Sequence, residues 1–167
     1  MPIQQYPRLL SVGTATPESS YTQQQILDLF KVTDPKTRKI FSHSHIKTRR
    51  LCLPEARSDG AVPEESQAQL LQKHVRQAVA LGSQAITNAL DKAQLTSGQI
   101  DYFAVVTSTG FVCPSLTALL ARALDMRADV HRIDLVGMGC NGGLNGLQPV
   151  ANFCAQHPGK YGLLLCA

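Results

Sequence analysis

The chain has 167 residues, of which 44% are hydrophobic and 17% are charged, and its formal net charge is +4. This length and balance favour a folded globular chain and argue against an intrinsically disordered one. The basic residues gather at positions 43–50, without the long basic stripe and interleaved aromatic residues typical of nucleic-acid-binding proteins. The charge therefore favours a small polyanionic ligand and argues against a nucleic-acid partner.

Five cysteines stand at positions 52, 113, 140, 154 and 166. They form no CxxC pair and have no metal-ligand spacing with the five histidines, so the sequence predicts no metal site. An odd number of cysteines, behind an N-terminus that does not read as a secretory leader, favours reduced thiols and a cytoplasmic protein. No apolar run is long enough to cross a membrane.

The first part of the sequence predicts short elements. Residues 7–12 read as a strand. Thr22 to Gln25 fits a capping box, which predicts a helix through Phe30. The basic stretch 31–54 predicts a loop with a short helix, followed by an extended piece at 48–53.

Beyond residue 62, helices and strands alternate. Pro63-Glu64-Glu65 is typical of a first helical turn, and apolar residues then recur at helical spacing to about Ala93. The later predicted elements are a strand at 101–108, a turn at 109–114, a helix at 116–126, a strand at 130–136, a helix at 141–156 and a strand at 161–167. The alternation predicts an α/β fold with a largely parallel sheet. A buried final strand with no closing helix behind it also predicts half of a larger fold.

Cys140 stands between the strand at 130–136 and the helix that follows it, in a turn flanked by glycines. The unpaired N–H groups of a helix's first turn favour a thiolate and can hydrogen-bond a nearby oxyanion, which makes Cys140 a candidate nucleophile. Cysteine is also among the most buried residue types, so a place in the core is the alternative. Each glycine inside a helix costs about 0.8–1.0 kcal/mol relative to alanine. Close helix packing or close approach of a substrate would explain Gly142, Gly143 and Gly146.

The segment Gly137-Met138-Gly139-Cys140-Asn141-Gly142-Gly143-Leu144-Asn145-Gly146-Leu147 resembles the nucleophilic-cysteine motif of chalcone-synthase-like (type III) polyketide synthases. It is most similar to the bacterial dihydroxyphenylacetyl-CoA synthase branch of that family. Other segments agree with the family in order and spacing, namely Gly13-Thr14-Ala15-Thr16-Pro17, Ile46-Lys47-Thr48-Arg49-Arg50, and Thr107-Ser108-Thr109-Gly110 with Pro114. The resemblance covers essentially the whole chain.

This resemblance implies the N-terminal half of a thiolase-like αβαβα fold with a mixed, mostly parallel sheet, so that residues 1–167 are one ketosynthase half-domain. It implies an acyltransferase that performs decarboxylative Claisen condensation of malonyl-CoA on an acyl chain bound to Cys140. Coenzyme A thioesters are the expected substrates, and no further cofactor is expected.

Family members are longer, and their catalytic histidine and asparagine lie in the second half. None of the histidines at 43, 45, 74, 131 and 157 stands where the family places its histidine, so each is expected to be structural or solvated. A second polypeptide or fragment is therefore expected to complete the fold, and completed protomers are expected to form a homodimer.

The basic segment has two interpretations. Lys47, Arg49 and Arg50 form either a solvated charged loop or a site for the phosphates of coenzyme A, because long cationic side chains pair with phosphate oxygens. The resemblance favours the second interpretation, with Lys47 and Arg50 ahead of Arg49.

The residues after the strand at 101–108 form either an ordinary turn or a ligand site at the carboxyl end of a strand. The resemblance implies that Ser108 and Thr109, followed by Phe111, line an acyl cavity beside Cys140. It also places Cys113 at the position that reaches across the dimer interface into the partner's cavity.

Two alternatives remain. A condensing enzyme similar to ketoacyl-ACP synthase III would share the fold and the cysteine but depend on an acyl carrier protein. A non-catalytic partner would only dimerise with or scaffold another ketosynthase, and such a protein has little need for an intact Cys140 or for the basic segment.

Overall fold

The computed structural model describes residues 6–167 except residues 56, 59 and 61. The chain forms two compact units. The first, here called the α/β unit, comprises the residues up to Ala15 together with Gln67–Ala167, and the second, here called the basic unit, comprises Thr16–Ser66. Whether they make up the single half-domain expected from the sequence stays a prediction.

The basic unit contains β1 (Ser20–Thr22), α1 (Gln23–Leu29), α2 (Pro35–His43) and β2 (Thr48–Arg50), and the two strands pair antiparallel. The predicted capping box is confirmed. Gln25 N donates to Thr22 Oγ1 at 3.2 Å, and Thr22 N donates to Gln25 Oε1 at 2.7 Å. The short helix predicted in the basic stretch is α2, which starts where Asp34 accepts a hydrogen bond from Thr37 N.

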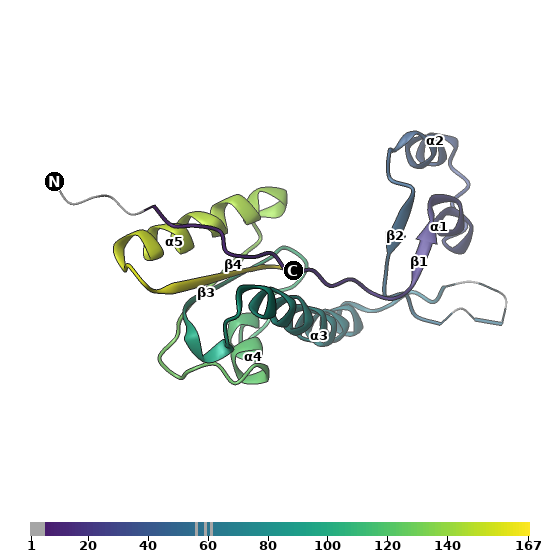
Figure 1. The fold of residues 1–167 in the computed structure, drawn as a ribbon. Helices are drawn as coiled ribbons and strands as arrows, with labels where there is room; N and C mark the ends of the chain where they lie inside the picture. Colours follow the sequence, from purple (N-terminus) through teal and green to yellow (C-terminus); the bar gives the residue numbers. More distant parts are fainter. Residues whose placement is uncertain (1–5, 56, 59, 61) are drawn as a thin grey trace. The chain divides into compact units, whose positions relative to one another are not determined.

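The α/β unit contains a three-stranded parallel sheet in the order β4-β3-β5 (Figure 1). Its elements are α3 (Gln67–Ala93), a 3₁₀ turn (Ser97–Gln99), β3 (Ile100–Thr107), α4 (Leu116–Ala123), β4 (His131–Val136), a second 3₁₀ turn (Gly139–Asn141), α5 (Gly142–Gln156) and β5 (Tyr161–Cys166). The prediction of an α/β fold with a parallel sheet is confirmed.

Helices cover both faces of this sheet (Figure 1). On one face, α3 and α4 pack with side chains of β3 and β5 into the hydrophobic core, which includes Ile86, Leu90, Phe103, Val105, Leu116, Leu120 and Leu165. On the other face, α5 contacts β3 and β5. Most of β3 is buried because it is the central strand and is covered on both sides.

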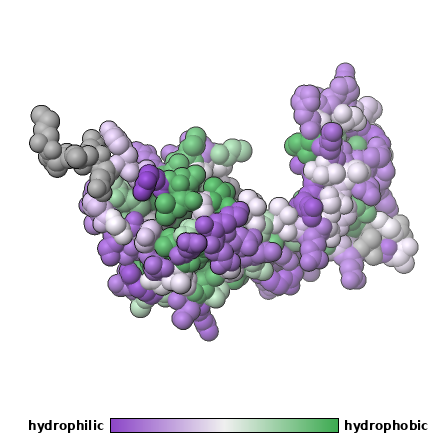
Figure 2. Space-filling model, in the orientation of Figure 1, coloured by the Kyte–Doolittle hydropathy of each residue, from purple (hydrophilic) through white to green (hydrophobic). Residues whose placement is uncertain are grey.

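The outward side of α5 carries two exposed leucines near its start and polar residues such as Gln148 and Asn152 further along. Leu144 and Leu147 are 74% and 47% exposed, and Figure 2 shows hydrophobic residues at the surface of this part of the α/β unit. Within the part of the chain that the structure describes, no helix has the length and apolar character of a membrane span.

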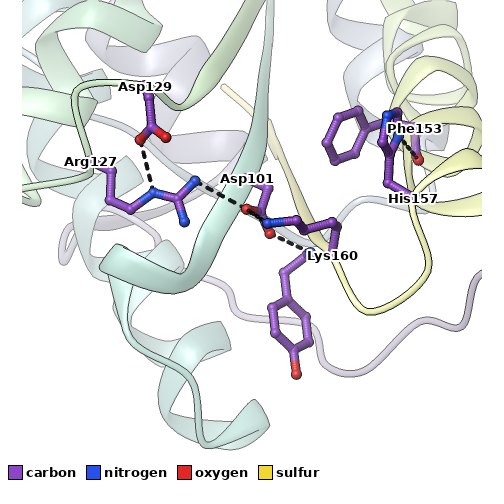
Figure 3. Close-up of polar contacts among 7 residues, drawn as sticks. Asp101, Arg127, Asp129, Phe153, His157 and Lys160 are labelled. Atoms are coloured by element: carbon purple, nitrogen blue, oxygen red, sulfur yellow. Dashed lines mark hydrogen bonds and ion pairs between the residues drawn. The ribbon is translucent and has the colours of Figure 1, made fainter.

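Asp101 ties three segments together near the start of β3 (Figure 3). Its Oδ1 accepts hydrogen bonds from Arg127 and from Lys160, each at 3.0 Å, and its Oδ2 accepts one from Tyr161 N at 3.0 Å. Burial by itself would raise the pKa of Asp101, but these hydrogen bonds outweigh it and hold that pKa below its ordinary value. The network fixes the start of β5 and the segment before β4 against β3.

One predicted strand is absent, and two predicted helix boundaries are wrong. Residues 7–12 form no strand; this segment is held to α3, where Ser11 Oγ donates to Ala89 O at 2.7 Å and Lys92 Nζ donates to Val12 O at 2.9 Å. The helix α3 begins at Gln67 rather than at residue 63, directly after a serine, a residue type favoured at N-caps. The helix α4 ends at Ala123 rather than at residue 126, because Asp125 adopts a φ of 49°.

Candidate active site

Cys140 lies in the 3₁₀ turn between β4 and α5, and it is exposed. The turn before it contains Gly137 and Gly139, with φ values of 80° and 63°. Side chains rarely adopt this left-handed conformation, so glycine at both positions lets the chain turn sharply from the strand end into the helix. Cys140 is therefore exposed in the described structure and is not part of its hydrophobic core.

The glycines that follow Cys140 serve close packing. A Cβ added to Gly142 would lie 2.5 Å from Val106 Cγ1, and one added to Gly146 would lie 2.6 Å from Val106 Cγ2. Gly143 differs, because its added Cβ would meet only Cys166 Sγ, at an ordinary 3.5 Å. Two of the three glycines thus let the start of α5 approach the central strand.

The end of β3 holds the turn in front of Cys140. Gly137 N donates to Thr107 O at 3.1 Å, and Gly139 N donates to Ser108 Oγ at 2.9 Å. Ser108 is thereby hydrogen-bonded to the backbone of the residue directly before Cys140, and its place in an acyl cavity stays a prediction.

The other predicted cavity residues stand in the same loop but differ in their contacts. Thr109 Oγ1 lies 3.0 Å from His74 Nδ1, so its hydroxyl is hydrogen-bonded to α3. Phe111 is 79% exposed, and its Cζ would lie 3.8 Å from a Cβ added to Gly137, which places the ring against the turn before Cys140. Cys113 is exposed.

The start of α5 can stabilise negative charge at this place. Asn141 stands at the N-cap but makes no side-chain hydrogen bond to the first turn. The N–H groups of a helix's first turn carry partial positive charge and can donate hydrogen bonds to an oxyanion that forms nearby. The arrangement suits a nucleophilic thiol with a donor group for the charge that develops on its reaction partner.

The three predicted phosphate ligands lie in the basic unit, where two of them are already engaged. Arg49 Nε donates to Gln23 Oε1 at 3.0 Å, and its guanidinium lies 5.4 Å from the centre of the Phe41 ring. Arg50 Nη1 donates to the carbonyl groups of Pro17 and Glu18 at 3.3 and 3.0 Å. Lys47 is exposed, and no hydrogen bond or ion pair of its side chain is found within the described part of the chain.

A second group of cations was missed from the sequence. Lys36 and Lys39 are exposed on α2 three residues apart, which places them on one face of the helix. The signal was present in that spacing, but it appears only once the helix bounds are known.

Among the described residues, no three histidine, cysteine or acidic side chains gather where they would hold a metal ion. The structure brings Cys140, Ser108, Thr109 and Phe111 to the carboxyl ends of β3 and β4. The basic residues belong to the other unit.

Comparisons with known proteins point to one family. Residues 16–167 match the family model described as FAE1/Type III polyketide synthase-like protein. The whole chain aligns with the 3,5-dihydroxyphenylacetyl-CoA synthase of Streptomyces toyocaensis at 44% identity, and the alignment covers 43% of that protein. Over 93% of its length the chain also aligns, at 33% identity, with 42% of the 1,3,6,8-tetrahydroxynaphthalene synthase of Streptomyces peucetius subsp. caesius.

A solved structure agrees with these sequence matches. PKS-I of the brown alga Ectocarpus siliculosus is similar over 96% of this chain and 47% of its own, with a TM-score of 0.86 and 26% identity. The chain thus spans less than half the length of the relatives it matches. The resemblance seen in the sequence is confirmed, and the chain belongs to the FAE1/type III polyketide synthase-like family.

Proposed function

We propose that the protein carrying this chain is an acyltransferase that loads an acyl group from a coenzyme A thioester onto Cys140 and extends it with malonyl-CoA. The observation that carries this proposal is the exposed thiol of Cys140 at the start of α5, with its preceding residue held by Ser108. Family membership supports it, as do the relatives named as synthases of polyketide type. Coenzyme A thioesters serve as substrates, and no further cofactor takes part.

The loading step is nucleophilic acyl transfer. The Cys140 thiolate attacks the thioester carbonyl carbon, a new carbon–sulfur bond forms, and the bond to the coenzyme A sulfur breaks, so that coenzyme A leaves as a thiolate and takes up a proton. In the extension step malonyl-CoA loses carbon dioxide, and the resulting enolate carbon attacks the acyl group on Cys140. The lengthened chain leaves on coenzyme A, and the Cys140 thiolate is regenerated.

In this proposal, extension also uses groups beyond the described residues around Cys140. The enolate oxygen requires hydrogen-bond donors, and an imidazole promotes thiolate formation. In the proposal, a second polypeptide or segment supplies them and packs on the outward face of α5, whose Leu144 and Leu147 are exposed. Completed protomers then form a homodimer in which Cys113 approaches the partner's cavity.

The phosphates of coenzyme A bind exposed cations of the basic unit in this proposal. Lys47 is the strongest of the three predicted candidates, because Arg49 and Arg50 are engaged by neighbouring groups. The face of α2 with Lys36 and Lys39 offers further positive charge. A Lys47→Ala variant should raise the KM for malonyl-CoA but not for the N-acetylcysteamine thioester, which has no phosphates. Arg122→Ala, an exposed cation on α4, is the matched control.

Acylation of the thiol is the deciding experiment. The native protein is incubated with malonyl-CoA or a short acyl-CoA, and peptide mass spectrometry locates the acyl adduct. The adduct is expected on Cys140, absent from Cys140→Ala and unchanged in Cys166→Ala, which removes another exposed thiol. Acylation only from an acyl carrier protein would favour the alternative condensing enzyme. No adduct from either donor would leave the non-catalytic scaffold.

A further inference from the structure

The imidazole of His74 lies between two threonine hydroxyl groups at the carboxyl end of β3. Its Nδ1 is 3.0 Å from Thr109 Oγ1, and its Nε2 is 3.4 Å from Thr107 Oγ1. The ring thus has a hydrogen-bond partner on each nitrogen, and the two partners flank Ser108 in the sequence.

The ring also packs on the backbone of the same turn. A Cβ added to Gly110 would lie 2.6 Å from His74 Cδ2 and 3.2 Å from Leu71 Cδ1. No side chain other than the hydrogen of glycine fits between the ring and the chain at this point. His74 therefore contacts the turn through hydrogen bonds on two residues and through close packing on a third.

The sequence explains why a histidine reaches this place. His74 stands three residues after Leu71, four before Ala78 and eight before Gly82, so at 3.6 residues per turn it lies on the same side of α3 as these partly or fully buried residues. A polar ring in an apolar stripe needs partners when it is partly buried, and the threonines provide them.

The loop that His74 contacts, which follows β3, is also the loop that contacts the 3₁₀ turn of Cys140. Ser108 lies between the two threonines, and its Oγ accepts the hydrogen bond from Gly139 N at 2.9 Å. A shift of the turn would move that acceptor and with it the backbone directly before the thiol. The contacts run without interruption from α3 through the end of β3 to the 3₁₀ turn of Cys140.

We propose that His74 is a positioning residue, which sets the reactivity of Cys140 by fixing Ser108 through the flanking threonines. Its part in acyl transfer rests on the function proposed above, whereas its effect on the thiol itself does not. Nothing in the mechanism requires the imidazole to touch a substrate.

The protonation of the ring agrees with this role. Burial lowers the pKa of His74 below its ordinary value, so the ring is neutral at neutral pH. A neutral imidazole offers one donor and one acceptor, and a threonine hydroxyl can accept from the first or donate to the second.

The test compares three variants of the native protein. His74→Ala removes both ring nitrogens, His74→Asn keeps a polar group near the place of Nδ1, and His157→Ala is the control at the far end of α5. The rate at which iodoacetamide alkylates Cys140 is followed by peptide mass spectrometry. The loss of one hydrogen bond is worth about 1 kcal/mol, so alkylation of Cys140 in His74→Ala is expected to be about fivefold slower than in the wild type. His74→Asn should recover most of that rate, and His157→Ala should match the wild type.

The double variant His74→Ala/Ser108→Ala shows whether the effect passes through Ser108. If it does, the double variant reacts no more slowly than Ser108→Ala alone, because residues of one network are not additive. Independent, multiplying losses would overturn the proposal, as would a His74→Ala rate equal to that of the control. If His74→Ala does not fold, the comparison of His74→Asn with Thr109→Val decides, and equal rates for His74→Asn, Thr109→Val and the wild type would also overturn it.

The two proposals fail separately. If the His74 variants slow alkylation but malonyl-CoA never acylates the wild type, the proposed function is wrong and the positioning role stands. If the wild type is acylated while the His74 variants alkylate and acylate at wild-type rates, the positioning role is wrong and the function stands.

Discussion

Asp134 in β4 caps a helix to which it does not belong. Its Oδ1 accepts a hydrogen bond from Thr117 N at 3.1 Å, and its Oδ2 accepts one from the Thr117 hydroxyl, in the first turn of α4. Ser115, the residue at the N-cap, makes no side-chain hydrogen bond to a backbone N–H of the first turn, although its hydroxyl oxygen lies 3.1 Å from Thr117 Oγ1. The carboxylate therefore joins the edge strand to α4, and it is placed where negative charge is favourable.

Asp134→Ala should lower the free energy of unfolding by about 1–2 kcal/mol, the usual effect of losing a helix cap. The measurement is urea unfolding followed by circular dichroism. Asp129→Ala is the control, because Asp129 is exposed and its carboxylate pairs with Arg127 at the surface. Equal stabilities of the two variants would mean that α4 does not depend on the carboxylate of β4.

Substitution by alanine is expected to have opposite effects on stability at Gly146 and at Gly143 of α5. Gly146→Ala would place a Cβ 2.6 Å from Val106 Cγ2 and 2.8 Å from Leu164 Cδ1, so it should destabilise the fold by about 1–3 kcal/mol. Gly143→Ala has room and should be neutral or stabilise by up to about 1 kcal/mol, since alanine favours helix. Denaturant midpoints of both variants test this order, and the reverse order would contradict the close packing of α5 on β3.

Acid should weaken the fold partly through Asp101. The pKa of Asp101 is held below its ordinary value of 3.8, so its contribution to stability is full above that pH. The contribution is lost as the pH falls through the lower value of the folded state. Asp101→Asn should destabilise the protein by about 1–3 kcal/mol at pH 7 and make the remaining stability less sensitive to pH below about 4. Thermal unfolding from pH 7 to pH 3 provides the comparison, and parallel curves for the two proteins would contradict the role of this carboxylate.

Ser108→Ala tests the contact before the nucleophile. Loss of the acceptor for Gly139 N, about 1 kcal/mol, should slow alkylation of Cys140 about fivefold. Ser97→Ala, in the 3₁₀ turn before the opposite end of β3, should leave the rate unchanged. Mass spectrometry of samples quenched at successive times measures both rates. A wild-type rate for Ser108→Ala would show that this hydrogen bond does not control the reactivity of the Cys140 thiol.

Local signals were sufficient for much of the fold. The capping box at Thr22 and the helical spacing up to Ala93 depend on neighbouring residues, and both predictions are confirmed. The glycines after Cys140 also signalled close packing correctly for Gly142 and Gly146, because a helix tolerates them only for a reason. The predicted strand at 7–12 is wrong because the structure of this segment depends on residues far away in the sequence. Its apolar residues fit a strand, but its partners lie 78 and 80 positions away on α3.

The candidate site was predictable as a set of residues but not as an arrangement. Cys140 and Ser108 were named from motifs, yet the hydrogen bond from Gly139 to Ser108 joins positions 31 apart and follows no local rule. His74 was expected to be structural or solvated, because it does not stand where the family places its histidine. Only the tertiary contact with Thr109 distinguishes it.

The two ends of the central strand β3 have different roles. Asp101 anchors neighbouring segments near its amino end, while Thr107 and Ser108 hold the turn of Cys140 at its carboxyl end, about 20 Å away at the rise of an extended strand. An engineer who needs a more heat-resistant version of this chain can therefore redesign the surroundings of Asp101 and leave the chemistry of the thiol untouched.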